Sequence, residues 1–467
     1  MESRKKFLTY TYIYACAGLI FACWLLSFMK NHNLLHLHFD IESLGFVVIG
    51  IIALIAQIFI IDSFYFGILL IFTPIAFARS FDLTTMPPTV YILVVFAVLG
   101  LAINMILHPR SIKKGVYFFS ILVFCVGMCF GGLIKSDAFL NSLFASLVIS
   151  IAIVFIYIYL VTYLEKHSFR ELCHVMIAFS MIMILQTLFF QLLLRRGAMF
   201  LTKDAEYGWG CTNNLATMMM LTFPFTIYLT IDARRPIVPF LVIFLGLQAL
   251  TVLLNYSRGA LFAGLIMGPL CLIYAFVKTK DKLLFALYYI LILFALFIFF
   301  VVLHAIDIDL YDIIWENVFD FDVETLNNRK EIYMKMLEAS KDHLLFGRGL
   351  MSTQGADLYG VNPDNLAVNG YLWAHNTFIH CLYISGIFGI LTMLYHLYTK
   401  YYALLKKPNA KKIVTLFGLL ASGFYGLIDI SYYYVIYMVA MIVLMAFMDY
   451  EIEDSELSLE GDLSDDE

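Results

Sequence analysis

Two side chains of this 467-residue sequence have the chemistry expected of a group-transfer site, an imidazole at His375 and a guanidinium at Arg258. Histidine titrates near neutral pH, so a neutral imidazole can take a proton from a hydroxyl group. Arginine presents its N–H groups in a planar fork that matches the oxygens of a diphosphate. If both side chains meet in one pocket, they can serve an incoming alcohol and a leaving diphosphate.

Each residue also has a simpler interpretation. His375 stands at the expected mouth of a membrane helix, where lipid headgroups and water solvate an imidazole. Arg258 stands in a very short turn between two apolar runs, where an arginine can reach lipid phosphate. Position alone does not decide between these interpretations and the catalytic one.

The elements that must position these side chains are membrane helices. The sequence is 62% hydrophobic and 14% charged, and it repeatedly supplies runs long enough to cross a bilayer. These runs are continuous, whereas barrel strands alternate, so they indicate helices. We expect an all-α, polytopic integral membrane helix bundle with about 14 spanning helices, in a range of roughly 12–14.

The predicted spans follow one another with short polar connections. They are Phe7–Met29, Leu44–Ile61, Phe64–Ala78, Thr89–Leu107, Val116–Ile134, Ala138–Leu164, His174–Leu194, Thr212–Ile231, Ile237–Leu254, Gly259–Val277, Leu283–His304, His375–Thr399, Ile413–Ile428 and Tyr432–Met448.

Lys and Arg are concentrated in alternate short loops, including the loop from Lys400 to Lys412. The positive-inside rule then places these loops and both termini in the cytoplasm, in a multi-pass protein of the cytoplasmic (inner) membrane. The stretch after Arg4 resembles a signal peptide but is long enough to span, so an uncleaved first helix is expected. Residues 449–467 are acidic and predict a disordered cytoplasmic tail.

Residues 306–374 form one large extracytoplasmic loop between the eleventh and twelfth predicted spans. A loop of this length is expected to be structured or functional. Within it, Asn328 to His343 has apolar residues at helical spacing, which predicts an amphipathic helix on the outer bilayer face. Arg195 and Arg196 lie on the same face, so an anionic, lipid-linked substrate fits this side of the membrane.

Four blocks of residues resemble the bacterial O-antigen ligase and O-antigen polymerase superfamily of membrane glycosyltransferases. In chain order they are Gly208-Trp209-Gly210 with Asn213-Asn214; Ser257-Arg258-Gly259-Ala260; Asn328-Arg329 through His343 to Gly349; and His375-Asn376 with Gly386 and Gly389. The resemblance divides the chain into N-terminal spans at 1–194, a catalytic membrane region at 195–430, a last span at 431–448 and the tail at 449–467.

The resemblance implies an inverting, metal-independent glycosyltransferase that uses no cofactor and binds no nucleic acid. It would move a glycan from an undecaprenyl diphosphate carrier to a sugar hydroxyl outside the cytoplasmic membrane. His375 would be the general base and Arg258 would stabilise the leaving diphosphate. The implied substrate-binding residues are Arg195, Arg196, Asn213, Asn214, Arg329 and Asn376.

The acceptor stays open at this point. A surface-polysaccharide polymerase would extend a growing chain, with a chain-length regulator and a flippase as partners, whereas a ligase would move a finished chain to lipid A core or another anchor. A polymerase is favoured because capsules and exopolysaccharides need one even where no lipid A core exists. A polysaccharide flippase is the alternative from another class, but Lys and Arg are nearly absent from the middle of the predicted spans.

Overall fold

A computed structural model of the chain describes residues 2–31, 59–76, 88–134, 139–190, 212–232, 236–255, 257–305, 323–353, 367–368, 371–372, 374–427 and 429–464, and positions 55 and 136. Arg195, Arg196 and most of the second predicted span, Leu44–Ile61, lie outside these residues. The side chain of Arg329 is likewise outside them, although its backbone belongs to a helix.

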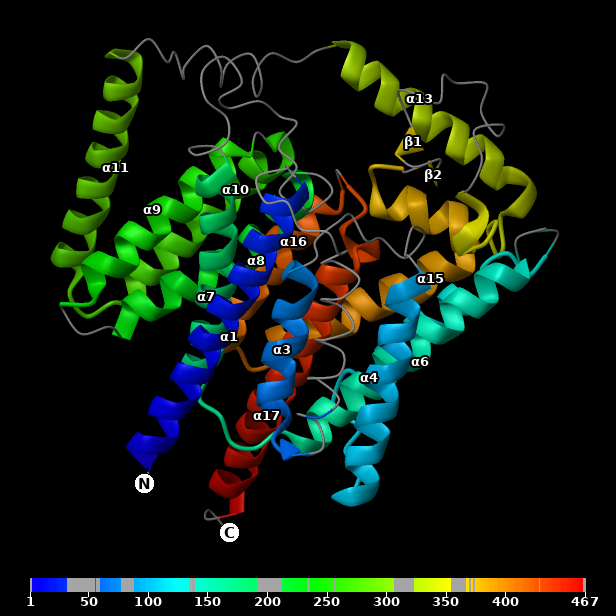
Figure 1. The fold of residues 1–467 in the computed structure, drawn as a ribbon, viewed down its shortest axis with the longest axis horizontal. Helices are drawn as coiled ribbons and strands as arrows, with labels where there is room; N and C mark the ends of the chain where they lie inside the picture. Colours follow the sequence, from blue (N-terminus) through cyan, green and yellow to red (C-terminus); the bar gives the residue numbers. More distant parts are fainter. Residues whose placement is uncertain are drawn as a thin grey trace. The chain divides into compact units, whose positions relative to one another are not determined.

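The described residues are helical except for one short hairpin and the connecting turns (Figure 1). The α-helices are α1 (Glu2–Asn31), α3 (Ser63–Ala76), α4 (Pro88–Leu107), α5 (Phe118–Cys129), α6 (Phe139–Tyr163), α7 (Phe169–Leu188), α8 (Thr212–Asp232), α9 (Val238–Leu254), α10 (Arg258–Lys278), α11 (Lys282–Ala305), α13 (Val323–Ser340), α15 (Thr377–Leu405), α16 (Ala410–Tyr425) and α17 (Val435–Ser464). The short elements are η4 (Lys341–His343), η5 (Leu350–Thr353), η7 (Ser431–Tyr433) and the antiparallel pair β1 (Ala367–Val368) and β2 (Tyr371–Leu372).

Seven of these helices are long and apolar enough to cross a membrane by length and composition. The seven candidate spans are Lys5–Leu26, Phe139–Tyr163, Phe169–Leu188, Asn213–Ile231, Arg258–Lys278, Thr377–Leu405 and Val435–Ile452. Shorter apolar helices accompany them. The predicted all-helical fold with several candidate spans is thus confirmed for the described residues, whereas the full count of about 14 spans and the large extracytoplasmic loop stay predictions.

The chain divides into two compact units. Unit 1 comprises Met1–Phe21, Ser168–Leu326 and Val414–Tyr425, and unit 2 comprises Ala22–His167, Asn327–Ile413 and Gly426–Glu467. Each unit combines segments that are distant in sequence. The predicted catalytic region, residues 195–430, is divided between the two units, and each unit also contains helices from outside this region.

In unit 1, helices α7, α8, α9 and α10 lie side by side, shown in green tones in Figure 1. Helix α7 begins at a capping box in which the Ser168 hydroxyl accepts from the Glu171 N–H at 3.3 Å and the Glu171 carboxylate accepts from the Ser168 N–H at 3.0 Å. Gly418 of α16 approaches α8 so closely that a Cβ there would lie 2.6 Å from the Leu221 carbonyl oxygen. A small residue is therefore required where these two helices cross.

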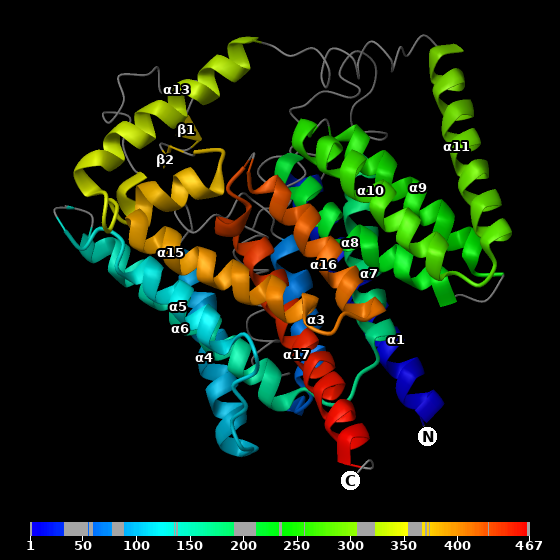
Figure 2. The same ribbon diagram turned by 180° about the vertical axis from the view of Figure 1, so that it is seen from behind.

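In unit 2, α5 runs alongside both α6 and α15 (Figure 2). Helix α15 is not the continuous span that the sequence predicts, because Gly386 has φ 67° and ψ −163° and breaks it. Helix α5 ends at Cys129, before the end of the predicted span Val116–Ile134, and Gly132 in the turn that follows has φ 81°. Both departures lie at or near a glycine, which adopts positive φ without a steric penalty.

Helix α17 continues to Ser464, whereas the sequence predicted a disordered tail from residue 449. The first turn of this tail is packed, because Asp449 is 1% exposed and accepts from the Val116 N–H at 2.8 Å. Glu451 forms an ion pair with Lys411 at 2.5 Å. These anchors and a sequence rich in Glu and Leu, which favour helices, explain why the helix extends beyond Met448.

Candidate functional site

His375 lies immediately before α15 in unit 2, and its neighbour Asn376 caps that helix. The Oδ1 atom of Asn376 accepts from the N–H groups of Phe378 at 2.9 Å and Ile379 at 3.1 Å. Its Nδ2 atom donates to the carbonyl oxygen of Leu427 at 2.9 Å. An asparagine N-cap satisfies helix N–H groups that otherwise have no partner. Asn376 therefore ties the start of α15 to the loop after α16.

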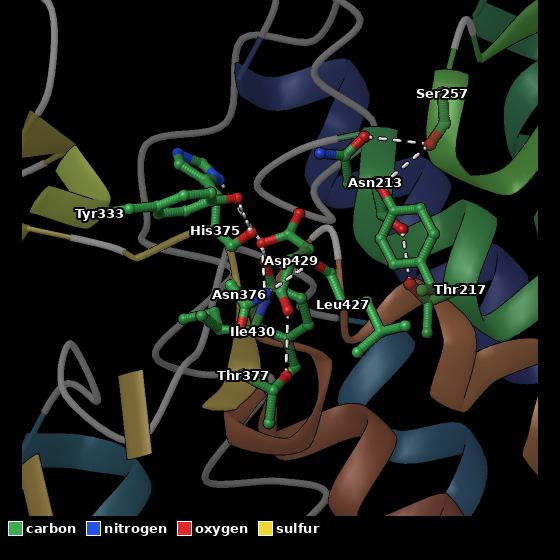
Figure 3. A network of polar contacts seen from close by, with 12 residues as sticks. Asn213, Thr217, Ser257, Tyr333, His375, Asn376, Thr377, Leu427, Asp429 and Ile430 are labelled. Carbon is green, nitrogen blue, oxygen red and sulfur yellow. Dashed lines mark hydrogen bonds and ion pairs between the residues drawn. The ribbon is translucent and has the colours of Figure 1, made fainter. Parts of the chain in front are cut away.

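Asp429, in that loop, is the charged neighbour of His375 (Figure 3). The Nδ1 atom of His375 lies 3.6 Å from Oδ1 of Asp429, an ion-pair distance that is longer than a hydrogen bond. Asp429 is 1% exposed, and the backbone around it is fixed because its carbonyl oxygen accepts from the Thr377 hydroxyl at 3.0 Å. The structure thus assembles an Asp–His pair from two segments that are distant in sequence.

The surroundings of Asp429 favour its charged form. Complete burial opposes charge on the carboxylate, but His375 and two hydrogen bonds outweigh it, so the pKa of Asp429 lies below its ordinary value. The two hydrogen bonds come from the Tyr434 hydroxyl at 2.7 Å and the Ile430 N–H at 2.8 Å. A carboxylate beside an imidazole orients the ring and stabilises the imidazolium that forms when the ring takes up a proton.

The backbone of His375 is held in an uncommon conformation. Its φ of 46° lies in the left-handed region, which costs free energy in a residue other than glycine. Tyr333 of α13 donates its hydroxyl to the His375 carbonyl oxygen at 3.0 Å, as Figure 3 shows. The buried Ile332 and Met336 anchor the same helix. The predicted amphipathic helix is thereby present and reaches the site.

The exposed part of the imidazole lies away from Asp429. The Nδ1 atom is buried and has no hydrogen-bond partner among the described residues, yet the side chain is 36% exposed. The accessible edge is therefore the one that contains Nε2. In the tautomer that carries its proton on Nδ1, facing Asp429, Nε2 offers a lone pair to an approaching hydroxyl group.

The third sequence block, which ends at Gly349, meets the fourth, which contains Gly386, at the break in α15. The segment Leu344–Gly349 fills this break, since the Arg348 and Gly349 N–H groups donate to the carbonyls of Tyr383 and Ile384, each at 2.8 Å. In return, the Ile387 and Phe388 N–H groups donate to the carbonyls of Leu344 at 2.8 Å and Leu345 at 3.1 Å. The helix hydrogen bonds lost at Gly386 are replaced by the inserted segment, which fixes the first half of α15 and His375 before it.

The first and second sequence blocks meet in unit 1. The Ser257 hydroxyl donates to Oδ1 of Asn213 at 3.1 Å and lies 2.9 Å from the hydroxyl of Tyr425 at the end of α16. Figure 3 shows the first of these contacts. Arg258 is the first residue of α10 and is partly buried. The positive end of the helix dipole and the guanidinium together suit an anion at this position.

The candidate residues thus fall into two groups. Asn213, Asn214 and Arg258 belong to unit 1, whereas His375 and Asn376 belong to unit 2. The convergence of Arg258 and His375 and the contacts of each candidate with substrate stay predictions. Among the residues that the structure describes, no group of three or more His, Cys, Asp or Glu side chains could hold a metal ion.

Sequence reasoning missed Asp429. The available signal was a single acid between two predicted spans, Ile413–Ile428 and Tyr432–Met448, at the membrane side assigned to His375. An ionisable residue in so short a connection is a candidate for function. Tyr333 was included in the predicted amphipathic helix, but its contact with His375 could not be derived from periodicity.

Residues 241–394 match the family model described as O-antigen ligase. The match contains the second, third and fourth sequence blocks, and therefore Arg258, Arg329, His375 and Asn376. It begins after Asn213 and ends before Asp429. The comparison with curated proteins found no match. The predicted resemblance to the O-antigen ligase and polymerase superfamily is confirmed by the family match.

Proposed function

We propose, from the match of residues 241–394 to the family model described as O-antigen ligase, that the chain is a membrane glycosyltransferase of surface-polysaccharide synthesis. The donor is a glycan linked to a polyprenyl diphosphate, and the acceptor is a sugar hydroxyl. The single observation that carries the chemistry is the His375–Asp429 pair, with an exposed imidazole edge and a buried carboxylate.

In the proposed reaction, Nε2 of His375 accepts the proton of the acceptor hydroxyl while its oxygen attacks the anomeric carbon. The bond between that carbon and the diphosphate oxygen breaks, and the diphosphate departs with the electron pair. Attack from the opposite side inverts the anomeric centre. Asp429 holds the ring and stabilises the imidazolium, and Arg258 binds the departing diphosphate.

Diphosphate is a stable leaving group, so one base and well-placed cations are sufficient in this proposal. A general base contributes about 10²–10⁴ in rate, and one electrostatic donor about 10²–10³. We therefore propose a metal-independent reaction without a cofactor. The other proposed contacts with donor or acceptor come from Arg195, Arg196, Asn213, Asn214, Arg329 and Asn376.

We place the site outside the cytoplasmic membrane, on the side of the predicted large loop. Contacts within unit 2 are consistent with the predicted alternation of loops. His343 lies 3.2 Å from the Ile134 carbonyl oxygen, and both were assigned to the outer side. Asp62 pairs with His167 at 2.7 Å, and both were assigned to the inner side. Both termini then lie in the cytoplasm.

Within the superfamily we favour a polymerase, which extends a chain of repeat units. The experiment that tests this choice uses the full-length protein in proteoliposomes with a polyprenyl-diphosphate-linked repeat unit. One arm offers the same repeat unit as acceptor, a second offers lipid A core, and a third repeats the first after dialysis against a chelator. A ladder of products in the first and third arms supports a metal-independent polymerase, whereas product only with lipid A core identifies a ligase.

A further inference from the structure

Lys400 is a fully buried charged residue of unit 2. It lies on α15 beyond the break and is 0% exposed. Its Nζ atom donates to the Tyr432 hydroxyl at 2.5 Å and lies 3.6 Å from Sδ of Met441. The rings of Tyr401 and Tyr432 lie 4.8 and 4.7 Å from Nζ. Among the described residues, its ammonium is held by a phenol, a thioether and two aromatic faces, with no carboxylate in contact.

Lys400 belongs to helix α15, although the sequence assigns it to the start of an inner loop. Its contact on α17 is Met441, whereas Lys411 of the same predicted loop contacts Glu451, nearer the end of α17. These two positions on α17 are separated by about 15 Å at the normal helix rise. A cation at such depth is costly and usually serves a function.

Tyr432 connects this lysine with the loop that carries Asp429. It is the middle residue of η7, whose turn is closed by the Tyr433 N–H, which donates to the Ile430 carbonyl at 2.8 Å. Ile430 directly follows Asp429 and donates its N–H to the Asp429 carboxylate. The Tyr432 hydroxyl and the Asp429 carboxylate are therefore fixed by one short, hydrogen-bonded segment.

We propose that Lys400 is a positioning residue for the His375–Asp429 pair and that it acts through Tyr432. The ammonium fixes the Tyr432 hydroxyl from one side of the helix break. From the other side, the Thr377 hydroxyl donates to the Asp429 carbonyl oxygen at 3.0 Å. Both halves of α15 thus fix the loop that presents the carboxylate to His375.

This inference rests on the proposed glycosyl transfer, because its effect is on the rate of that reaction. A displacement of a catalytic group by about 1 Å can lower a rate by about 10²-fold. The group displaced here is the orienting carboxylate, which does not itself bind the donor. The loss is therefore expected in kcat, with the KM for the lipid-linked donor nearly unchanged.

Two variants test the inference in full-length protein reconstituted in proteoliposomes. Lys400→Met removes the charge and keeps the length of the side chain, and Tyr432→Phe removes only the hydroxyl. The matched control is Tyr157→Phe, since Tyr157 is 0% exposed and its hydroxyl bonds to Asp449 at the far end of the apolar part of α17. We expect kcat to fall about 10- to 100-fold in the first two variants and to stay within about twofold in the control.

Lys400→Met and Tyr432→Phe, each combined with Asp429→Asn, test whether Lys400 acts through the Asp429 carboxylate. Lys400→Met is expected to have no further effect on kcat there, because the carboxylate that it positions is already lost. An equal effect of Lys400→Met in both backgrounds would overturn the inference, as would a loss in Tyr157→Phe as large as in Tyr432→Phe. If Lys400→Met does not yield folded protein, Tyr432→Phe decides, and an unchanged kcat overturns the inference. An inactive wild type would instead contradict the proposed function itself.

Discussion

The Nδ1 atom of His375 lies 3.6 Å from Oδ1 of Asp429, although one residue precedes α15 and the other follows α16. Three hydrogen bonds close this connection, from the Thr377 N–H to the Gly426 carbonyl at 2.8 Å, from the Thr377 hydroxyl to the Asp429 carbonyl at 3.0 Å, and from the Asn376 amide to the Leu427 carbonyl at 2.9 Å. The first turn of α15 therefore determines where the carboxylate meets the imidazole.

Replacing Asp429 by Asn should lower kcat about 10²-fold or more while the KM for the lipid-linked donor changes little. The amide keeps the shape of the side chain but cannot stabilise an imidazolium. The matched control is Asp62→Asn, because Asp62 forms another buried pair with a histidine, His167, at 2.7 Å in the same unit. Steady-state transfer rates should separate the two variants. Equal losses in both would indicate a general effect of losing a buried acid.

Replacing Arg258 should weaken stabilisation of the leaving diphosphate. Arg258→Ala is expected to lower kcat/KM about 10²–10³-fold. Arg258→Lys should recover part of this loss, since it keeps the charge but not the planar fork. The control is Lys278→Ala, which removes an exposed cation at the opposite end of α10. Full activity of Arg258→Ala would assign Arg258 to lipid contact instead.

The lowered pKa of Asp429 predicts a specific acid dependence of stability. A group whose pKa is depressed by folding stabilises the protein at pH values above its ordinary pKa of 3.8, and this stabilisation is lost as pH falls toward the folded-state pKa. Thermal unfolding in detergent should therefore show a constant Tm difference between wild type and Asp429→Asn at neutral pH. That difference should narrow below about pH 4. A Tm difference that stays constant well below about pH 4 would contradict the lowered pKa of Asp429.

Gly347 should be intolerant of substitution, because its φ is 63° and a Cβ would lie 2.5 Å from backbone atoms of Ile384 and Ser385. The left-handed conformation alone costs Gly347→Ala about 1–2 kcal/mol, and the close approach adds to this. Gly268→Ala is the matched control, since a Cβ there meets nothing within 4 Å. Thermal unfolding should show a clear loss of stability in the first variant and little change in the second. A normal Tm for Gly347→Ala would contradict the described insertion into the α15 break.

The sequence predicted the parts of this fold that depend on local pattern. Long apolar runs located α6, α7, α8 and α10, and helical spacing located α13, because bilayer thickness and helix period act within a single segment. His375 and Arg258 were selected as candidates by their chemistry and their places at the ends of apolar runs, and their roles stay predictions. These signals need no knowledge of how distant segments pack.

The remaining features depend on pairing between distant segments. The position of Asp429 beside His375 depends on hydrogen bonds between the start of α15 and the loop after α16, which no periodicity encodes. Gly347 and Gly386 were recognised as part of a motif, but the exchange of backbone hydrogen bonds between them is visible only in three dimensions. Lys400 was assigned to a loop because charge is counted along the sequence, whereas its burial is determined by packing against α17.

The proton-accepting role of His375 is tested most directly by single-turnover glycan transfer in proteoliposomes, with wild type, His375→Ala and His343→Ala compared at equal amounts of folded protein. His343 is the matched control, because it is also a partly exposed histidine of unit 2 and it contacts the Ile134 carbonyl oxygen. We predict that wild type and His343→Ala transfer the glycan from the polyprenyl diphosphate at similar rates, and that His375→Ala is slower by about 10²–10⁴-fold. Transfer by His375→Ala at the wild-type rate would contradict the account.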